Sequence, residues 1–292
     1  MIKLVIGGVP EHFNLPWHLA LEARRFAAWD IEVSWRDFPD GSGAMAKALR
    51  EGQLDAALLL TEGAIAGVAD GGGFQIASLY ADSPLLWGIH VPAASRFRAV
   101  AEIRGARYAV SRRGSGSHLM AVVHARDRGW TTDDLEFVIV RNLAGAVDAF
   151  AAGAADVFFW EKFMTKPLVD AGQFRRIGDF AAPWPAFVAC VADAASADQR
   201  AVFTRVLGLV LDEARALRAR PDAASLIADR YGLLATDVVE WLATTRWSDR
   251  VSVAPRDLDA ACAALGSLGV LARAVSARDC IAATGSRSPR AD

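Results

Sequence analysis

Residues 54–80, LDAALLLTEGAIAGVADGGGFQIASLY, contain the pattern that decides the fold. The apolar run at 54–60 is typical of a buried strand, residues 62–69 are predicted to be helical, and the glycines at 71–73 precede a second apolar run at 74–80. A strand, a helix and another strand in this order form the repeating unit of a parallel sheet covered by helices. This stretch therefore predicts an α/β protein.

The same alternation of strands and helices extends in both directions from this stretch. Further strands are predicted at 2–7, 31–38, 85–91, 107–111, 135–140, 156–160, 174–177 and 187–191. Further helices are predicted at 15–28, 44–52, 117–128, 144–152, 164–171, 197–220, 222–231, 235–246 and 255–271. The chain is thus predicted to contain two α/β units in series, followed by a helical segment.

The order of these elements predicts a domain organisation in which the chain passes between the two units twice, at about 85–92 and 183–191. With the helical C-terminal segment packed on the first unit, the result is two Rossmann-like lobes joined by two hinge crossovers. Lobe I is predicted to comprise residues 1–87 with 188–283, lobe II residues 88–187, and the polar residues 284–292 a disordered tail. A cleft between lobes is a favoured site for small ligands and closes by hinge motion.

Composition excludes several classes of protein. The chain has 292 residues, the length of about two domains, and 53% are hydrophobic, which excludes a disordered protein. The 32 basic residues are balanced by 34 acidic ones, which argues against a nucleic-acid partner. No apolar stretch reaches the length of a membrane span, so we expect none.

The N-terminus and the cysteines indicate the cellular compartment in which the protein is expected. Because Met1 leads directly into a predicted strand without a signal peptide, we expect a cytoplasmic protein, or a periplasmic one if a signal has been removed ahead of Met1. Cys190, Cys262 and Cys280 lie far apart and lack metal-site spacing, so they are interpreted as core residues in a reducing compartment.

Several segments carry a resemblance to known proteins: GVPEHFNLP at 8–16, LTEG at 60–63, SRRGSGSH at 111–118, WEKFMTKP at 160–167 and PWP at 183–185. They resemble the type 2 periplasmic-binding-protein fold and, within it, the NMT1/THI5-like branch. They look like an orphan subgroup of that branch, found in bacteria and fungi, which is similar to the substrate-binding proteins of ABC transporters. The likeness covers residues 1 to about 190. The cysteine-rich motif of the pyrimidine-synthesising enzymes of this branch is missing, so their histidine chemistry is not carried over to His12 or His18.

Ligand-binding side chains are expected where parallel strands end and the sheet opens into the cleft. In the first such loop Glu11, His12 and Asn14 offer an acid, an imidazole and an amide, although Asn14 could instead cap the following helix. Ser42, in a glycine-rich turn, could contact a ligand or cap its helix. Thr61 and Glu62 follow another strand, where the helix dipole alone would favour an acidic side chain.

The loop at 111–118 is the strongest candidate for a binding site. Glycines expose backbone N–H groups at a predicted helix N-terminus, and Arg112, Ser115, Ser117 and His118 add a positive charge and further polar groups. The order of residues is not that of a P-loop, and a plain glycine and serine turn is the alternative. The loop predicts an anion site.

Aromatic residues complete the candidate site. Trp87 and Trp184 lie in the two predicted crossovers, and Trp160 ends a strand together with Glu161. Their rings could hold a flat heterocycle between them, or they could simply pack in the core. Asn142, after another strand, could bind a ligand or cap a helix.

These features favour a soluble substrate-binding protein that captures a small anionic or heteroaromatic metabolite, such as a thiamine-precursor pyrimidine, a sulfonate or a carboxylate. An ABC permease is the partner if the protein serves transport. The alternative, implied by the resemblance to cytosolic proteins that use this fold for chemistry, is a cytosolic enzyme on the same scaffold, acting in thiamine-precursor or menaquinone-type biosynthesis. No catalytic residue, metal or cofactor is predicted from the sequence, and we expect a monomer.

Overall fold

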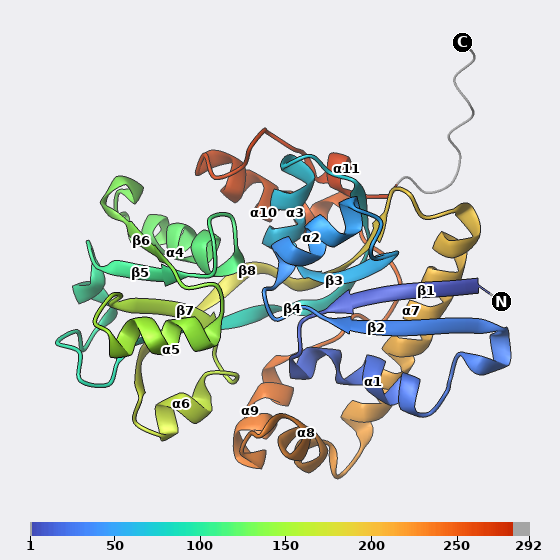
Figure 1. Ribbon diagram of the computed structural model, residues 1–292, viewed down its shortest axis with the longest axis horizontal. Helices are drawn as coiled ribbons and strands as arrows, with labels where there is room; N and C mark the ends of the chain where they lie inside the picture. Colours follow the sequence, from blue (N-terminus) through green and yellow to red (C-terminus); the bar gives the residue numbers. More distant parts are fainter. Residues whose placement is uncertain (1, 283–292) are drawn as a thin grey trace.

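The computed structural model describes residues 2–282 and contains a single eight-stranded sheet with helices on both faces (Figure 1). The strands are β1 (Ile2–Gly8), β2 (Ile31–Asp37), β3 (Ala56–Leu60), β4 (Phe74–Pro92), β5 (Arg107–Val110), β6 (Glu136–Ile139), β7 (Val157–Glu161) and β8 (Phe174–Ala192). Their order across the sheet is β2-β1-β3-β8-β4-β7-β5-β6. The first three strands form one lobe and β5, β6 and β7 the other, with β4 and β8 between them.

The sheet is mixed. The prediction that its strands are parallel is correct within each lobe and wrong for the strands that connect the lobes. β1 is parallel to β2 and β3, and β5 is parallel to β6 and β7. In contrast, β8 is antiparallel to β3 and to β4, and β4 is antiparallel to β7. The physical reason is that β4 carries the chain out of the first lobe and β8 carries it back, so these two strands run in opposite directions.

Each crossover is one long strand and not two short ones. β4 replaces the two strands predicted at 74–80 and 85–91, and β8 replaces those predicted at 174–177 and 187–191. β4 and β8 pair from Phe74 opposite Ala192 to Pro92 opposite Phe174. Between the predicted short strands, Pro84 faces Pro185 at an irregularity of the pairing. Proline lacks the N–H that a sheet ladder needs, so the ladder is interrupted there while the strand continues.

The helices of the two lobes follow the predicted order. They are α1 (Leu15–Glu22), α2 (Ser42–Arg50), α3 (Thr61–Ala69), α4 (Gly116–Asp127), α5 (Leu143–Ala151) and α6 (Lys166–Asp170). α1 ends well short of the predicted residue 28. The cause is Arg24, whose φ of 49° is left-handed and therefore incompatible with a continuing helix.

The C-terminal segment is helical and packs on the first lobe, as predicted. It contains α7 (Ala197–Ala219), α8 (Ala223–Tyr231), α9 (Ala235–Thr244), α10 (Pro255–Ser267) and the short α11 (Ala277–Cys280). α7 packs against α1 and β1, and α10 packs against α3 and β8. α10 is shorter than predicted, and the predicted disordered tail at 284–292 lies outside the described residues.

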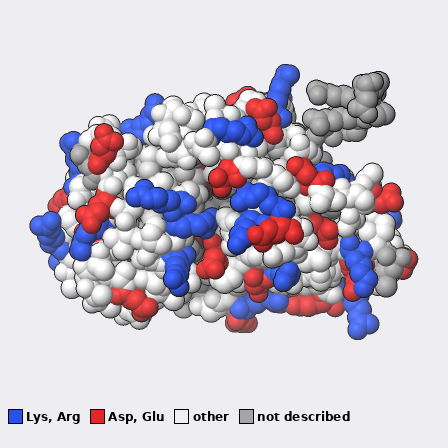
Figure 2. Space-filling view, turned by 45° about the horizontal axis from the view of Figure 1, so that its top comes forward, with Lys and Arg blue, Asp and Glu red and all other residues white. Residues whose placement is uncertain are grey.

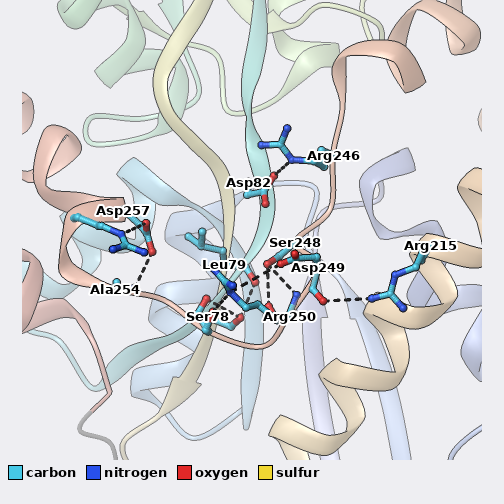
Figure 3. Close-up of polar contacts among 12 residues, drawn as sticks. Ser78, Leu79, Asp82, Arg215, Arg246, Ser248, Asp249, Arg250, Ala254 and Asp257 are labelled. Carbon is cyan, nitrogen blue, oxygen red and sulfur yellow. Dashed lines mark hydrogen bonds and ion pairs between the residues drawn. The ribbon is translucent and has the colours of Figure 1, made fainter.

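The link between α9 and α10 runs along β4 and ties this segment to the first crossover (Figure 3). The Leu79 N–H donates to the Ser252 carbonyl at 3.0 Å, and the Ser248 N–H donates to the Tyr80 carbonyl at 2.9 Å. Arg246 adds an ion pair with Asp82. The C-terminal segment is thereby held on the half of β4 that belongs to the first lobe.

Surface and core agree with the composition. Basic and acidic side chains are interspersed on the face shown in Figure 2, as the near-zero net charge leads one to expect. Cys190, Cys262 and Cys280 are buried free thiols. Among the helices of residues 2–282, none is long and apolar enough to cross a membrane.

Candidate functional site

A cavity of about 340 Å³ lies between the two lobes. It has room for about eleven water molecules, the size of a small metabolite. The residues predicted for the site that line it are Glu11, Ser42, Trp87, Arg112, Ser115, Ser117, Asn142, Trp160 and Glu161. They come from both lobes, because the strands of each lobe end at the same cleft.

The other predicted site residues do not line the cavity. The His12 ring is buried 4.2 Å from the ring of Trp241, and both its nitrogens lack a partner among the described residues. Burial lowers the pKa of His12 to about 3, so it is neutral. The Asn14 amide donates to the Val9 carbonyl at 2.8 Å, which shapes the loop that carries Glu11, while forming no capping bond to α1.

Four further predicted residues do not line the cavity, and their side chains form hydrogen bonds with other residues of the protein. Thr61 donates to the Pro185 carbonyl at 2.6 Å. The His118 Nδ1 accepts from the Gly114 N–H at 3.1 Å. The Trp184 indole donates to the Glu62 carboxylate at 2.8 Å, and burial raises the pKa of Glu62 to about 7. Whether these side chains influence binding stays a prediction.

Three helices begin at the cavity, and each presents its N-terminus to it. Ser42 is the first residue of α2, Gly116 of α4 and Leu143 of α5, and all three line the cavity. The first-turn N–H groups of a helix have no partner within the helix and carry its positive dipole end. The cavity therefore offers several converging donors to an anion.

Polar side chains hold these helix ends in place. Ser115 caps α4 by accepting from the His118 N–H at 3.4 Å, and Asn142 caps α5 by accepting from the Gly145 N–H at 3.1 Å. Ser42 does not cap α2, contrary to one of the two predicted roles. Its hydroxyl instead accepts from the Leu60 N–H at 3.0 Å, which connects α2 to the end of β3.

Arg112 brings a positive charge into the cavity and reaches across the cleft. It lies in the second lobe, and its guanidinium donates to the Asp40 carbonyl of the first lobe at 2.9 Å. The guanidinium lies directly over Gly43, where a Cβ atom would be 1.7 Å from Arg112 Nη2. A glycine at position 43 is therefore what permits this contact.

Two carboxyl groups face the same cavity. Glu161 is 4% exposed and its Oε2 accepts from the Phe163 and Met164 N–H groups at 2.8 and 2.6 Å. Burial raises the pKa of Glu161 well above its usual range, and the charge of Glu11 raises it further. Burial also raises the pKa of Glu11 to about 7. Within the described part of the chain, no cluster of His, Cys, Asp or Glu side chains could hold a metal ion.

Aromatic and aliphatic side chains form the remaining walls. Trp87 faces Glu161 across the β4–β7 pair, and Trp160 stacks on Phe158 with 5.0 Å between ring centroids. The apolar residues of the lining were not predicted from the sequence; they are Leu60, Leu85, Leu143, Met164 and Phe187. In the sequence they cannot be distinguished from core residues of the same strands and helices, so no local signal could have found them.

Comparisons with known proteins agree with this architecture. The sequence profile of a family described as Ca3427-like PBP matches residues 87–180. No curated protein sequence matches the chain. Among solved structures, the Candida albicans CA3427 gene product, described as defining a new family with the generic periplasmic-binding-protein fold, is 24% identical with a TM-score of 0.89, covering 99% of this chain and 98% of its own.

Two sulfonate-binding proteins are also similar in structure. The alkanesulfonate-binding protein SsuA of Xanthomonas axonopodis pv. citri, bound to MOPS, is 20% identical with a TM-score of 0.82, covering 96% of this chain and 98% of its own. The periplasmic aliphatic sulphonate-binding protein SsuA of Escherichia coli is 19% identical with a TM-score of 0.74, and the match covers 100% of this chain and 96% of that protein. At these identities the likeness establishes the fold.

Proposed function

Given that the chain has the periplasmic-binding-protein fold, we propose that it is a substrate-binding protein that captures a small metabolite with an anionic head group between its lobes. The observation that carries this proposal is the convergence of three helix N-termini and Arg112 on one cavity. Helix N-termini and arginine bind sulfonate, phosphate or carboxylate groups through N–H donors and positive charge.

The walls of the cavity narrow the ligand class further. Trp87 and Trp160 offer flat apolar surfaces that suit an alkyl chain or a heteroaromatic ring. Two proteins of similar structure are described as binding sulfonates, which supports sulfonates as the first probes. Pyrimidines of the thiamine-precursor type, proposed from the NMT1/THI5-like resemblance, and simple carboxylates are the other classes to test.

A thermal-shift screen tests the proposal. Sulfonates, carboxylates, phosphates and pyrimidines are added singly to the protein, and a ligand of the cavity is expected to raise the melting temperature because it binds only the folded state. Titration calorimetry then gives the affinity of each hit. If no compound with an anionic group stabilises the protein at millimolar concentration, the proposal is wrong.

Binding is further proposed to close the cleft by hinge motion about the lobe boundaries at 87/88 and 187/188, which fall inside β4 and β8. An ABC permease would then recognise the closed form. Small-angle scattering with and without ligand measures closure as a decrease in the radius of gyration, and an unchanged radius contradicts it.

An enzyme on this scaffold is the second candidate, and one observation favours it. Glu11 lines the cavity with a pKa of about 7, which is the value that a general acid or base needs at neutral pH. Glu11→Gln separates the two functions. If the variant loses turnover but retains its affinity for the ligand, the protein is an enzyme. If the unchanged protein shows no turnover and the variant changes only in affinity, the protein is a receptor.

A further inference from the structure

We propose that the ligand also carries a protonated amine, and that Glu11 and Glu161 bind it, so that the cavity selects small zwitterions over simple anions. This inference rests on the anion site proposed above and adds the second half of the ligand. The cavity contains two carboxyl groups in addition to the donors that suit an anion. An anion alone leaves these carboxyl groups without a role.

The hydrogen bonds of these carboxyl groups are incomplete. The two backbone donors to Glu161 both reach Oε2, and Oε1 has no hydrogen-bond partner among the described residues. The carboxylate of Glu11 has no partner of either kind, hydrogen bond or ion pair, in residues 2–282. Glu11 and Glu161 both line the cavity, so a donor on a ligand bound there can reach these unpartnered oxygens.

Among residues 2–282, neither Glu11 nor Glu161 forms an ion pair with a lysine or arginine. Lys162, which follows Glu161, directs its Nζ to Glu240 at 2.7 Å and to Asp179 at 3.1 Å. Arg112 donates to the Asp40 carbonyl. Burial is the main reason that the pKa of Glu161 is raised, and the charge of Glu11 raises it further, so the two carboxylates repel each other when both are ionised.

A ligand amine would remove this repulsion. An ammonium group has three donors, enough for the free Oε1 of Glu161 and for the Glu11 carboxylate together. The helix N-termini and Arg112 would meanwhile hold the acidic head of the same molecule. The chemical class is a small amino acid, aminosulfonate or aminophosphonate whose two charges are joined by a short apolar chain.

Matched pairs of probes test this class by titration calorimetry. Taurine is compared with ethanesulfonate, β-alanine with propionate, and aminoethylphosphonate with ethylphosphonate, so that each pair differs in the amine alone. For at least one head group, the amino compound is expected to bind about 10-fold tighter or more, as a charge-assisted hydrogen bond implies. Equal affinities within every pair that binds overturn the inference while leaving the anion site intact.

Variants assign the preference to the two residues. Glu11→Gln and Glu161→Gln keep the side-chain volume and an acceptor oxygen, and each should abolish the preference, measured as the ratio of the two affinities within a probe pair. Glu136→Gln, at an exposed position of β6 outside the cavity, is the matched control. If the variants weaken both members of a pair equally, the carboxyl groups do not bind the amine. If no probe binds at all, the proposed anion site fails and this inference fails with it.

Discussion

Arg112 is the residue whose role in binding can be tested most directly. Its guanidinium contributes the positive charge of the cavity and touches the opposite lobe through the Asp40 carbonyl. The neighbouring Arg113 does not line the cavity, and its guanidinium lies 5.8 Å from the centroid of the Phe137 ring. The two arginines are adjacent in the sequence, so they form a natural pair of test and control.

Arg112→Gln is expected to weaken the binding of an anionic ligand by about 10- to 100-fold, because a charge-assisted hydrogen bond is lost. Arg113→Gln should change the affinity by less than about 3-fold. Titration calorimetry with the best-binding sulfonate or carboxylate measures both. An equal loss in the two variants would show that general electrostatic attraction, and not contact with Arg112, is responsible.

Glu62 allows a prediction of pH dependence. It is 1% exposed, and burial raises its pKa from 4.5 to about 7 despite the hydrogen bond from Trp184. The folded protein therefore holds a proton that the unfolded chain releases above pH 4.5, and its stability must fall as pH rises from 4.5 through 7. In Glu62→Gln this contribution is absent.

The free energy of unfolding of the unchanged protein should accordingly fall by roughly 3 kcal/mol more than that of Glu62→Gln over this range. Urea denaturation of both proteins at pH 4.5 and at pH 7 gives the four free energies of unfolding that are compared. Because Glu11 and Glu161 remain in both proteins, the difference between the two curves isolates Glu62. Parallel curves would mean that Glu62 titrates normally.

At the scale of the elements, the start of α4 is closely packed against two strands. A Cβ atom at Gly116 would lie 2.6 Å from Leu60 Cδ1 and 3.0 Å from Trp87 Cη2. Glycine thus lets the first turn of α4 approach both β3 and the first crossover. Gly266, inside α10, has open space around it and is a suitable comparison.

Gly116→Ala is expected to weaken ligand binding by about 10-fold or more, because the methyl group must displace Trp87 or the helix end that faces the ligand. Gly266→Ala should leave affinity unchanged and raise stability by up to about 1 kcal/mol, the helix propensity difference. Calorimetry and thermal melting measure the two effects. Unimpaired binding by a folded Gly116→Ala variant would argue against α4 as part of the anion site.

At the scale of the whole molecule, two of the four lysines connect the lobes. Lys162 binds Glu240 of α9 and Asp179 of β8, and Lys166 binds Asp237 of α9 at 3.5 Å. α9 belongs to the C-terminal segment on the first lobe, where Trp241 packs against Phe13. These ion pairs therefore hold the second lobe against the first in the arrangement seen here.

Lys162→Met is expected to favour a more open arrangement, since it removes the charge that two carboxylates share. The radius of gyration of the ligand-free protein should increase, and ligand affinity should fall by about 3- to 10-fold because closure must be driven by the ligand. Lys47→Met, which removes an exposed pair with Glu51 at the C-terminal end of α2, is the control. No change in either quantity would show that Lys162 does not contribute to closure.

Local signals in the sequence were sufficient for much of this architecture. Apolar runs and helical spacing depend on neighbouring residues, and they predicted the order of strands and helices and the helical C-terminal segment. The glycines and serines at 111–118 likewise predicted the start of a helix, because capping and backbone access are properties of a few adjacent residues. The type 2 periplasmic-binding-protein resemblance is confirmed at the level of the fold.

Only the tertiary structure decided how distant segments meet. The antiparallel centre of the sheet, the continuity of β4 and β8 through their prolines, and the burial of His12 against Trp241 depend on partners far away in the sequence. The same holds for the presence of Glu11 and Glu161 in the lining of one cavity. Periodicity and capping are short-range, so the sequence by itself determined the elements and the ends of helices. Contacts between lobes are long-range, so the shape and charge of the cavity emerged only once the chain was folded.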